Sequence, residues 1–180
     1  MAPMSQTAPA AVPPPVEVEE GWAPFQPFPE LTARESFVSG GPSTHRLRVA
    51  YFKRPGDRRL LGRAWFGPET QGPPGHAHGG AVSAVMDEAL GAAAWGGGHQ
   101  VVVARLSVDF RAMVPLGTDA AFEAWVERVE GRKVHTRGRL LAPDGRLLAE
   151  GQALCVLLGS EHMEKFAAAR AARAARSPHR

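Results

Sequence analysis

Cysteine is nearly absent from this sequence, because Cys155 is the only one among 180 residues. A single cysteine excludes an intramolecular disulfide and a thiolate metal cluster, so we expect a reducing compartment, the cytoplasm. The sequence also lacks any stretch near the roughly 18 consecutive apolar residues that span a bilayer. Its N-terminus lacks the basic-then-apolar pattern of a secretion signal. We therefore expect a cytoplasmic protein without membrane insertion.

A strong net charge is missing as well. The formal charge of +3 comes from 21 Lys and Arg against 18 Asp and Glu. The tail from residue 160 onward carries this excess by itself, since it holds five basic residues and two acids: Lys165, Arg170, Arg173, Arg176 and Arg180 against Glu161 and Glu164. The body of the chain is therefore neutral, and nothing in it indicates a nucleic-acid partner.

Composition divides the chain into three parts. Residues 1–40 are rich in Pro and Ala and are predicted to form a flexible leader, whose Trp22, Phe25 and Phe28 could dock on the body. Residues 41–159 are predicted to form one domain. Residues 160–180 form an Ala/Arg-rich tail, in which the segment after Phe166 is predicted to be a frayed, solvated helix.

The body shows one helix pattern among several strand patterns. Segments 45–54 and 58–67 flank a Pro-Gly-Asp turn and predict a hairpin. Residues 75–93 predict a helix of small apolar residues. Three further strands are predicted at 119–130, 132–142 and 146–158, separated by tight turns. Such an order predicts an α+β fold, in which a curved antiparallel sheet wraps around one long central helix.

Two predicted strands show which face meets the core. In segment 101–113 the apolar and polar residues alternate. The core face is predicted to hold Val102, Ala104, Leu106, Val108 and Phe110, and the other face Arg105, Ser107, Asp109 and Arg111. In the last strand Ala149, Gly151, Ala153 and Cys155 share a face that is small enough for a helix to lie close.

The predicted helix carries two adjacent acids, Asp87 and Glu88, inside an apolar run. Burying an unpaired charge is costly, so such an acid is paired, exposed at an edge or retained for chemistry. A helix N-terminus offers free N–H groups that can polarise a carbonyl, and Gly79 and Gly80 would let an oxygen approach them.

The spacing of these residues indicates a dimer. Asp87 lies on nearly the same helix face as Gly80 but about 10 Å further along. A catalytic carboxylate must lie within hydrogen-bond reach of the carbonyl or one water away. Asp87 of the same helix is too distant, so the simplest arrangement is two antiparallel copies, with the glycines of one subunit facing Asp87 of the other.

Three separated motifs carry a family resemblance. The string GPPGHAHGGAVSAVMDEALG, followed by VDFRAMVPLG and then VEGRK, resembles the hotdog-fold acyl-CoA thioesterase superfamily, in its PaaI-like group. The pattern is most similar to the branch that includes mitochondrial acyl-CoA thioesterases, and the resemblance covers residues 45–158. It implies a hotdog fold and a homodimer or a dimer of dimers. It also implies hydrolysis of an acyl-CoA to a free acid and coenzyme A, without any cofactor beyond the coenzyme A of the substrate.

The same resemblance implies roles for individual residues. His78 and Gly79 would bind the thioester carbonyl, and Asp87 of the partner subunit would act as general base or nucleophile. Substrate-binding roles are implied for residues near the helix and at two other sites: Gly80, Glu88, Asp109, Arg111, Glu130, Gly131, Arg132 and Lys133. Arg and Lys suit a phosphate-bearing carrier. Trp95, Phe110 and Trp125 are candidates for lining the acyl pocket.

Two positions depart from the family pattern. Relatives often carry Ser or Thr near position 103 to orient water, whereas this chain has Val103, and some carry Asn where this chain has Gly72. These departures keep open a non-catalytic acyl-CoA binding module, whereas a hotdog hydratase or dehydratase fits the motif order less well. His76 and His78 form an HxH pair that can bind zinc, but further ligands are not evident, so no metal is expected.

Overall fold

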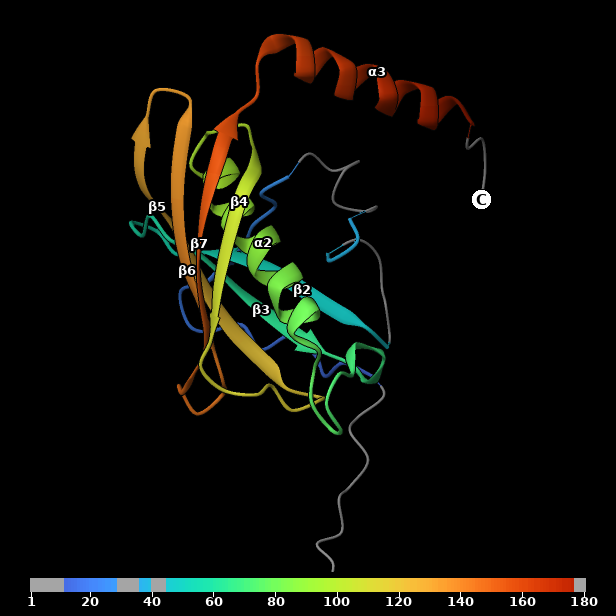
Figure 1. The fold of residues 1–180 in the computed structure, drawn as a ribbon, viewed down its shortest axis with the longest axis vertical. Coiled ribbons are helices and arrows are strands. Elements are labelled where there is room, and N and C mark those ends of the chain that lie inside the picture. Colours follow the sequence, from blue (N-terminus) through green and yellow to red (C-terminus); the bar gives the residue numbers. More distant parts are fainter. Residues whose placement is uncertain (1–11, 29–35, 40–44, 177–180) are drawn as a thin grey trace, which may run out of the picture.

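An antiparallel sheet curves around one long helix in the computed structural model, which describes residues 12–28, 36–39 and 45–176 (Figure 1). Within these residues the strand order is β1-β2-β3-β5-β6-β7-β4. The strands are β1 (Ala23–Pro24), β2 (Leu47–Lys53), β3 (Leu60–Phe66), β4 (Val101–Phe110), β5 (Asp119–Glu130), β6 (Lys133–Leu141) and β7 (Leu147–Leu157). The helices are the 3₁₀ turn η1 (Pro68–Thr70), α2 (Gly79–Gly96) and α3 (Ser160–Arg176).

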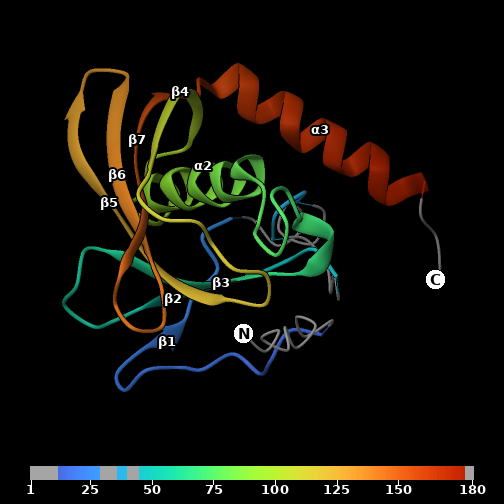
Figure 2. The same cartoon turned by 60° about the horizontal axis from the view of Figure 1, so that its bottom comes forward.

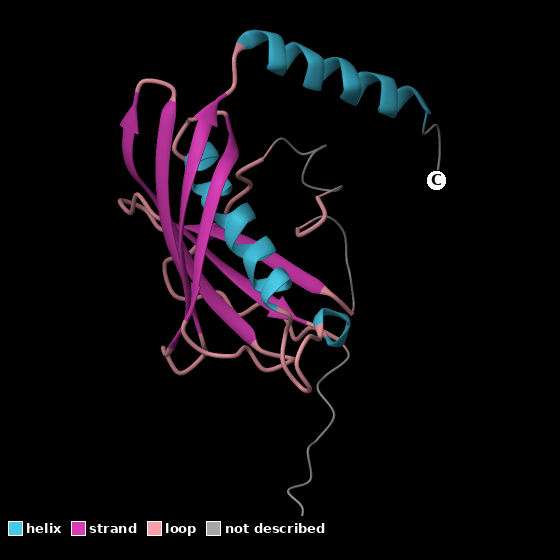
Figure 3. Ribbon diagram, in the orientation of Figure 1, coloured by secondary structure: helices cyan, strands magenta, loops and turns pink. Residues whose placement is uncertain are grey.

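The predicted fold class is confirmed. Strands β2 and β3 form the predicted hairpin, and β5, β6 and β7 pair antiparallel in sequence order. Helix α2 lies along the concave side of the sheet (Figure 3). Strand β4 follows α2 in the chain and pairs with β7, so it forms one edge of the sheet, and β1 forms the other. This arrangement leaves one long edge strand beside the central helix.

Two paired glycines let α2 lie close to the sheet. Gly138 of β6 and Gly151 of β7 are opposite each other. A Cβ atom at Gly138 would lie 3.2 Å from Cδ2 of Leu90, and one at Gly151 would lie 2.9 Å from Cε of Met86. Ala149, Ala153 and Cys155 of β7 are buried as well. The prediction that a helix packs closely on the small-residue face of this strand is therefore confirmed.

Leu90 is expected to be a principal stabilising side chain, because it is 0% exposed and fills the space above these glycines. Leu90→Ala is expected to lower the free energy of unfolding by about 2–5 kcal/mol, from lost burial and the cavity left behind. Urea titration measures this. Val129→Ala at a half-exposed position is the control and should change stability by about 0.5 kcal/mol or less. Equal losses in the two variants would contradict this packing.

The predicted facing of β4 is wrong at its start. The pairing of β4 with β7 shifts between Val103 and Arg105, which leaves Ala104 as an extra residue. Val101 and Val103 therefore face the core before the bulge, and Leu106 and Val108 face it afterwards. Val102 and Ala104, which were expected on the core face, are exposed. A bulge reverses the alternation, and the residue pattern alone gives no sign of it.

The leader packs against the body upstream of the predicted domain boundary at residue 41. Strand β1 pairs with the free edge of β2, and the Trp22 ring lies 5.4 Å from the Phe52 ring. Phe28 contacts the rings of Tyr51 and Trp95, and Lys53 lies over the Phe25 ring. The predicted docking of the three leader aromatics is thus confirmed. The rest of the predicted leader, at residues 1–11, 29–35 and 40, lies outside the described residues.

The leader also covers part of the outer side of the sheet. Phe52, Leu61 and Trp65 point away from α2, because neighbouring strand residues alternate and Tyr51 faces the helix. All three are buried, and Trp65 is 0% exposed. Glu17 of the leader pairs with Arg63 of β3 at 3.2 Å on the same side. Residues 12–24 therefore form a strap over a second, smaller apolar layer.

Helix α3 extends away from the sheet (Figure 2). It begins at Ser160, upstream of the predicted helical segment after Phe166, and its side chains from Glu164 to Ala172 are exposed. Lys165 and Glu161 form an i,i+4 ion pair at 2.6 Å on its first turns. None of the helices among the described residues has the length and apolar character needed to cross a membrane.

Candidate active site

His78 organises the N-terminus of α2. It is the N-cap residue, and its ring Nδ1 accepts a hydrogen bond of 2.8 Å from the N–H of Gly80. Its carbonyl oxygen accepts from the N–H groups of Ala81 at 2.9 Å and Val82 at 3.2 Å. Since Nδ1 acts as the acceptor, a neutral ring carries its proton on Nε2. His78 is thus the cap of α2, and its predicted contact with the thioester carbonyl stays a prediction.

The loop before His78 explains the glycine at position 72. The N–H of His78 donates to the carbonyl of Thr70 at 2.7 Å, and the N–H of Gly72 donates to the carbonyl of His76 at 2.9 Å. A Cβ atom at position 72 would lie 2.8 Å from Cα of His78. The loop therefore has no room for an asparagine at position 72.

The N–H of Gly79 is the free donor of this helix end. The next three N–H groups, of Gly80, Ala81 and Val82, all donate to His78. The Gly79 N–H has no hydrogen-bond partner among the residues that the structure describes. It therefore remains available to an oxygen that approaches along the axis of α2, where the helix dipole also favours negative charge.

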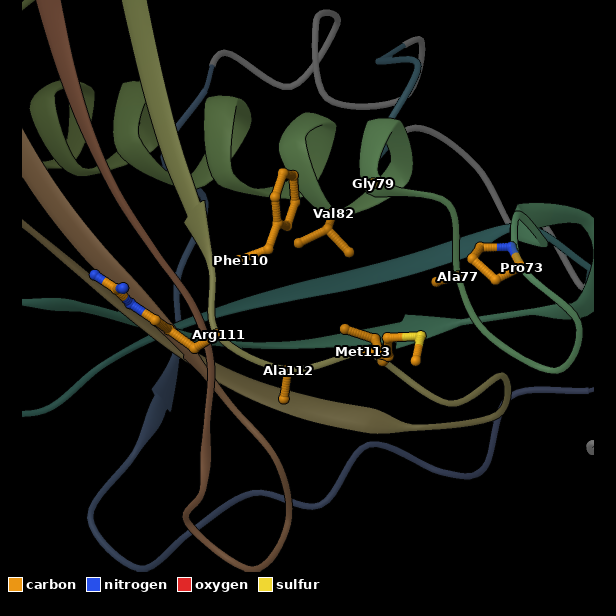
Figure 4. A pocket seen from close by; sticks show the side chains of 9 residues that line it. Pro73, Ala77, Gly79, Val82, Phe110, Arg111, Ala112 and Met113 are labelled. Atoms are coloured by element: carbon orange, nitrogen blue, oxygen red, sulfur yellow. The ribbon is translucent and has the colours of Figure 1, made fainter.

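A cavity of about 430 Å³ opens beside Gly79 (Figure 4). It lies between the first turn of α2 and the segment that follows β4. Its wall is mostly apolar and is formed by Pro73, Ala77, Gly79, Val82, Phe110, Arg111, Ala112, Met113 and Val114. Phe110 and Met113 are 54% and 64% exposed, which is unusual for large apolar side chains. The cavity therefore offers apolar surface next to the free N–H.

Arg111 lines this cavity, but its guanidinium is turned away from it and paired with acids. Its side chain extends away from the other lining residues (Figure 4) and pairs with Glu150 at 2.6 Å and with Asp109 at 3.6 Å. Phe110 is the one of the three predicted pocket aromatics that lines the cavity. Trp95 donates its ring N–H to the Val101 carbonyl, and Trp125 lies under Arg59. Neither tryptophan lines this cavity, whereas Val82 and Met113 do, and their spacing in the sequence gave no signal of it.

Asp87 is exposed on the side of α2 that faces β4. One turn later on the same face, a Cβ atom at Gly91 would lie 3.7 Å from Cγ2 of Val103 of β4, and one at Gly79 would lie 3.4 Å from the Phe110 ring at the other end of that strand. Partial burial raises the pKa of the Asp87 carboxyl, and the neighbouring Glu88 charge adds to the rise. Asp87 forms no ion pair within the described residues. A carboxylate with a raised pKa and no cation is typical of a general base.

Asp87 and Gly79 cannot act on one carbonyl within a single chain. They are eight residues apart in α2, which corresponds to about 12 Å along the helix axis. Hydrogen-bond reach is about 3 Å. Both groups are thus suitably exposed, yet the structure of one chain does not bring them together.

The predicted coenzyme A contacts occupy two distant places. Asp109 and Arg111 lie at the end of β4, whereas Glu130, Gly131, Arg132 and Lys133 form the turn between β5 and β6. Lys133 pairs with Val156 of β7, whose neighbour Leu157 is opposite Val101 at the start of β4. The two groups therefore lie at opposite ends of β4, about 30 Å apart.

The charges at these places are partly engaged. Glu130 pairs with Arg128 at 2.8 Å, and this partner holds the pKa of the Glu130 carboxyl below its usual value. Arg132 donates to the Leu157 carbonyl at 3.1 Å. Gly131 has a φ of 55°, which the turn requires and which L side chains rarely adopt. Lys133 has no ion pair within the described part of the chain, so its charge is available to an anion.

Comparison with known proteins shows what this domain is similar to. Residues 74–149 match the family model described as the thioesterase superfamily. The match includes the His78 cap, the Gly79 N-terminus and Asp87, and the hotdog fold expected from the sequence motifs is confirmed.

Named relatives and solved structures agree with this match. Acyl-coenzyme A thioesterase THEM4 of Xenopus laevis is 35% identical over 108 residues, which are 59% of this chain and 49% of that protein. A crystal structure of a thioesterase superfamily protein is 32% identical, with a TM-score of 0.54, and covers 61% of this chain and 53% of that one. The Escherichia coli PaaI protein of the phenylacetic acid degradation operon has a TM-score of 0.56 at 13% identity, over 63% of this chain and 80% of that one, and shows the shared fold. The chain spans about half the length of the THEM4 relative.

Proposed function

We propose that this protein hydrolyses acyl-CoA thioesters at sites shared between two subunits. The observation that carries the proposal is the pair formed by the free Gly79 N–H beside an apolar cavity and Asp87, which has no ion pair among the described residues and lies about 12 Å further along α2. The THEM4 relative is named an acyl-coenzyme A thioesterase, which supports the same reaction class.

Edge strand β4 provides a means of joining the two subunits. Its outer edge is free of a strand partner among the described residues, and exposed edges pair readily with another strand. Antiparallel pairing of two β4 strands about a two-fold axis sets the Phe110 end of one against the Val101 end of the other. Helix α2 runs antiparallel to β4, so the same symmetry brings Gly79 of one subunit toward Asp87 of the second.

The same two-fold unites the predicted coenzyme A contacts. Within one chain the Lys133 turn lies at the Val101 end of the sheet, far from the Gly79 cavity. Across the axis, the Lys133 turn of one subunit lies at the end of the sheet where the second subunit has Phe110. An unpaired Lys at that place suits the phosphates of coenzyme A as a point charge. One rotation thus assembles the donor, the acid and a cation from separate places.

The reaction follows from these positions. The thioester carbonyl accepts the Gly79 N–H, which with the helix dipole stabilises the negative charge on oxygen as the carbon becomes tetrahedral. Asp87 of the second subunit either takes a proton from water, which attacks the carbon, or attacks the carbon itself. Collapse of the intermediate breaks the C–S bond, and the sulfur leaves as coenzyme A with a proton. In the nucleophilic route, water then hydrolyses the resulting anhydride with Asp87.

We place the acyl group of the substrate in the cavity beside Gly79. Its wall offers the side chains of Val82, Phe110 and Met113, and its one charged residue, Arg111, is already paired with Glu150. Burying a carboxylate there without a partner would be costly. The cavity therefore suits uncharged acyl groups and excludes acyl groups that end in a carboxylate.

Thiol release from a panel of acyl-CoAs tests the proposal. The panel holds short, medium, long and aromatic acyl groups, together with butyryl-CoA and succinyl-CoA as a matched pair of equal carbon number. We expect turnover on uncharged members and at least about tenfold lower kcat/KM for succinyl-CoA than for butyryl-CoA. Equal turnover of the pair would contradict the placement of the acyl group.

A non-catalytic acyl-CoA binding module is the second candidate function. Val103 favours it, because its side chain faces α2 at Gly91, where a Cβ atom would lie 3.7 Å away, and offers no hydroxyl to orient water. This reading predicts saturable binding of acyl-CoA by calorimetry with no thiol release on any member of the panel. Turnover that depends on Asp87 would exclude it.

A further inference from the structure

Glu88 is a carboxylate that the proposed reaction leaves without a role. The Tyr51 hydroxyl of β2 donates to its Oε1 at 2.5 Å, and the Ser36 hydroxyl of the leader donates to its Oε2. No Lys, Arg or His pairs with Glu88 among the described residues. Two hydroxyl donors hold a carboxylate in place without neutralising it.

This carboxylate is fixed from two further elements. The Ser36 hydroxyl also accepts from the N–H groups of Val38 and Ser39 at 3.2 Å each, and Val38 is buried in the core. Tyr51 packs against Phe28 and Phe122. Burial raises the pKa of the Tyr51 hydroxyl well above its usual value, and Glu88 adds to the rise. Tyr51 therefore remains a hydroxyl donor to Glu88 at physiological pH.

Glu88 lies directly beside Asp87. The two residues are consecutive, so their side chains leave α2 about 100° apart, and neither forms an ion pair among the described residues. On the strands packed against this part of α2, burial raises the pKa of the Cys155 thiol, and the charge of Asp87 adds to the rise. Tyr51 is the titratable group coupled to Glu88. The neighbouring fixed charge that acts on Asp87 is therefore that of Glu88.

We infer that Glu88 is a positioning residue, whose carboxylate is held by Tyr51 and Ser36 so that a fixed negative charge lies beside the reacting carboxylate of Asp87. The inference rests on the proposed function only in assigning Asp87 as the base or nucleophile. It also gives the leader a role, because Ser36 ties residues 36–39 to the helix that carries Asp87.

The direction of the effect follows from electrostatics. A like charge disfavours ionisation, so removing it lowers the pKa of Asp87. Glu88→Gln removes the charge and keeps an oxygen that accepts from Tyr51. The acid limb of kcat/KM reports ionisation of the base in the free enzyme, so this limb moves to lower pH in Glu88→Gln. Partial burial still acts on Asp87, so its pKa stays above the value of an exposed aspartate.

The test is a ¹³C NMR titration of the Asp87 carboxyl, assigned by its disappearance in Asp87→Asn, together with the pH profile of hydrolysis. We expect the Asp87 pKa to fall in Glu88→Gln and to stay close to the wild-type value in Glu88→Asp, which retains the charge. A Ser36→Ala, Tyr51→Phe double variant frees the Glu88 side chain to turn toward water. In that variant we expect the Asp87 pKa to fall by less than in Glu88→Gln. This variant serves as the test if Glu88→Gln does not fold.

A purely structural Glu88 gives a different result. It would lower the thermal midpoint and the rate at every pH, while the Asp87 titration and the acid limb would stay in place, which would overturn the inference. Because the NMR titration needs no turnover, it decides the inference even when hydrolysis is absent. If no hydrolysis is found but the Asp87 pKa still falls in Glu88→Gln, only the proposed function would be contradicted.

Discussion

Asp87→Asn is expected to lower kcat for the best acyl-CoA by about 100-fold to 10,000-fold, the range that a positioned acid or base contributes. Asparagine retains the shape of the side chain but can neither take a proton from water nor attack the carbonyl. Asp87 is exposed in the single chain and forms no ion pair there within the described residues, so the fold should not depend on it. Thiol release under substrate saturation measures the loss.

Asp144→Asn is the matched control for this loss. Asp144 lies in the turn between β6 and β7, where it is exposed, lies 3.7 Å from the Arg146 guanidinium and accepts a hydrogen bond of 3.0 Å from the Arg146 N–H, which the Asn oxygen can also accept. Wild-type rates in this variant and unchanged thermal midpoints in both variants would assign the effect to chemistry. Full activity in Asp87→Asn would contradict the proposed mechanism.

Gly79→Pro is expected to lower kcat by about 100-fold to 1,000-fold, as the loss of one oxyanion donor does in other enzymes. Gly79 is the first residue of α2, where the N–H has no partner within the helix and where proline is well tolerated. The preceding His78 has φ −64° and ψ 140°, which suits a residue before proline. The substitution thus removes the proposed donor with little cost to the helix.

Gly79→Ala separates the donor from the shape of the site. Alanine retains the N–H, and its Cβ would lie 3.4 Å from the Phe110 ring, so only a small adjustment is needed. We expect this variant to keep most of its activity. Equal losses in the alanine and proline variants would indicate that crowding at Phe110, and not the N–H, explains the effect.

Local patterns predicted the fold well, because each reflects the chain's own periodicity. The strands β5, β6 and β7 agree with their predicted ranges to within one residue at either end, and the small face of β7 follows from side-chain size alone. The bulge in β4 escaped prediction, because a single extra residue changes which face is buried without changing the composition. The packing of the leader also escaped in part, since aromatic residues in a Pro-rich segment do not identify their partners.

The part of the site at the N-terminus of α2 was predictable, because residues within one helix turn form it. The His78 cap and the free Gly79 N–H follow from a His-Gly-Gly string at a helix start. The role of Gly72 and the partners of Glu88 depend on close approaches between segments distant in the sequence, such as Tyr51 and Glu88. The distance between the two groups of predicted coenzyme A contacts also could not be read from the sequence, since it depends on the register of β4 and β7. In the proposed dimer a second subunit brings them together.

Activity recovered from two inactive variants tests the central claim of a shared site most directly. Asp87→Asn and Gly79→Pro chains are unfolded together at equal amounts, refolded and assayed beside each variant alone. In a mixed dimer with shared sites, one site carries both substitutions and the other carries neither, so random pairing should restore about a quarter of the wild-type rate. If each site belonged to a single chain, every site would carry one substitution, and the mixture would stay as inactive as its two components.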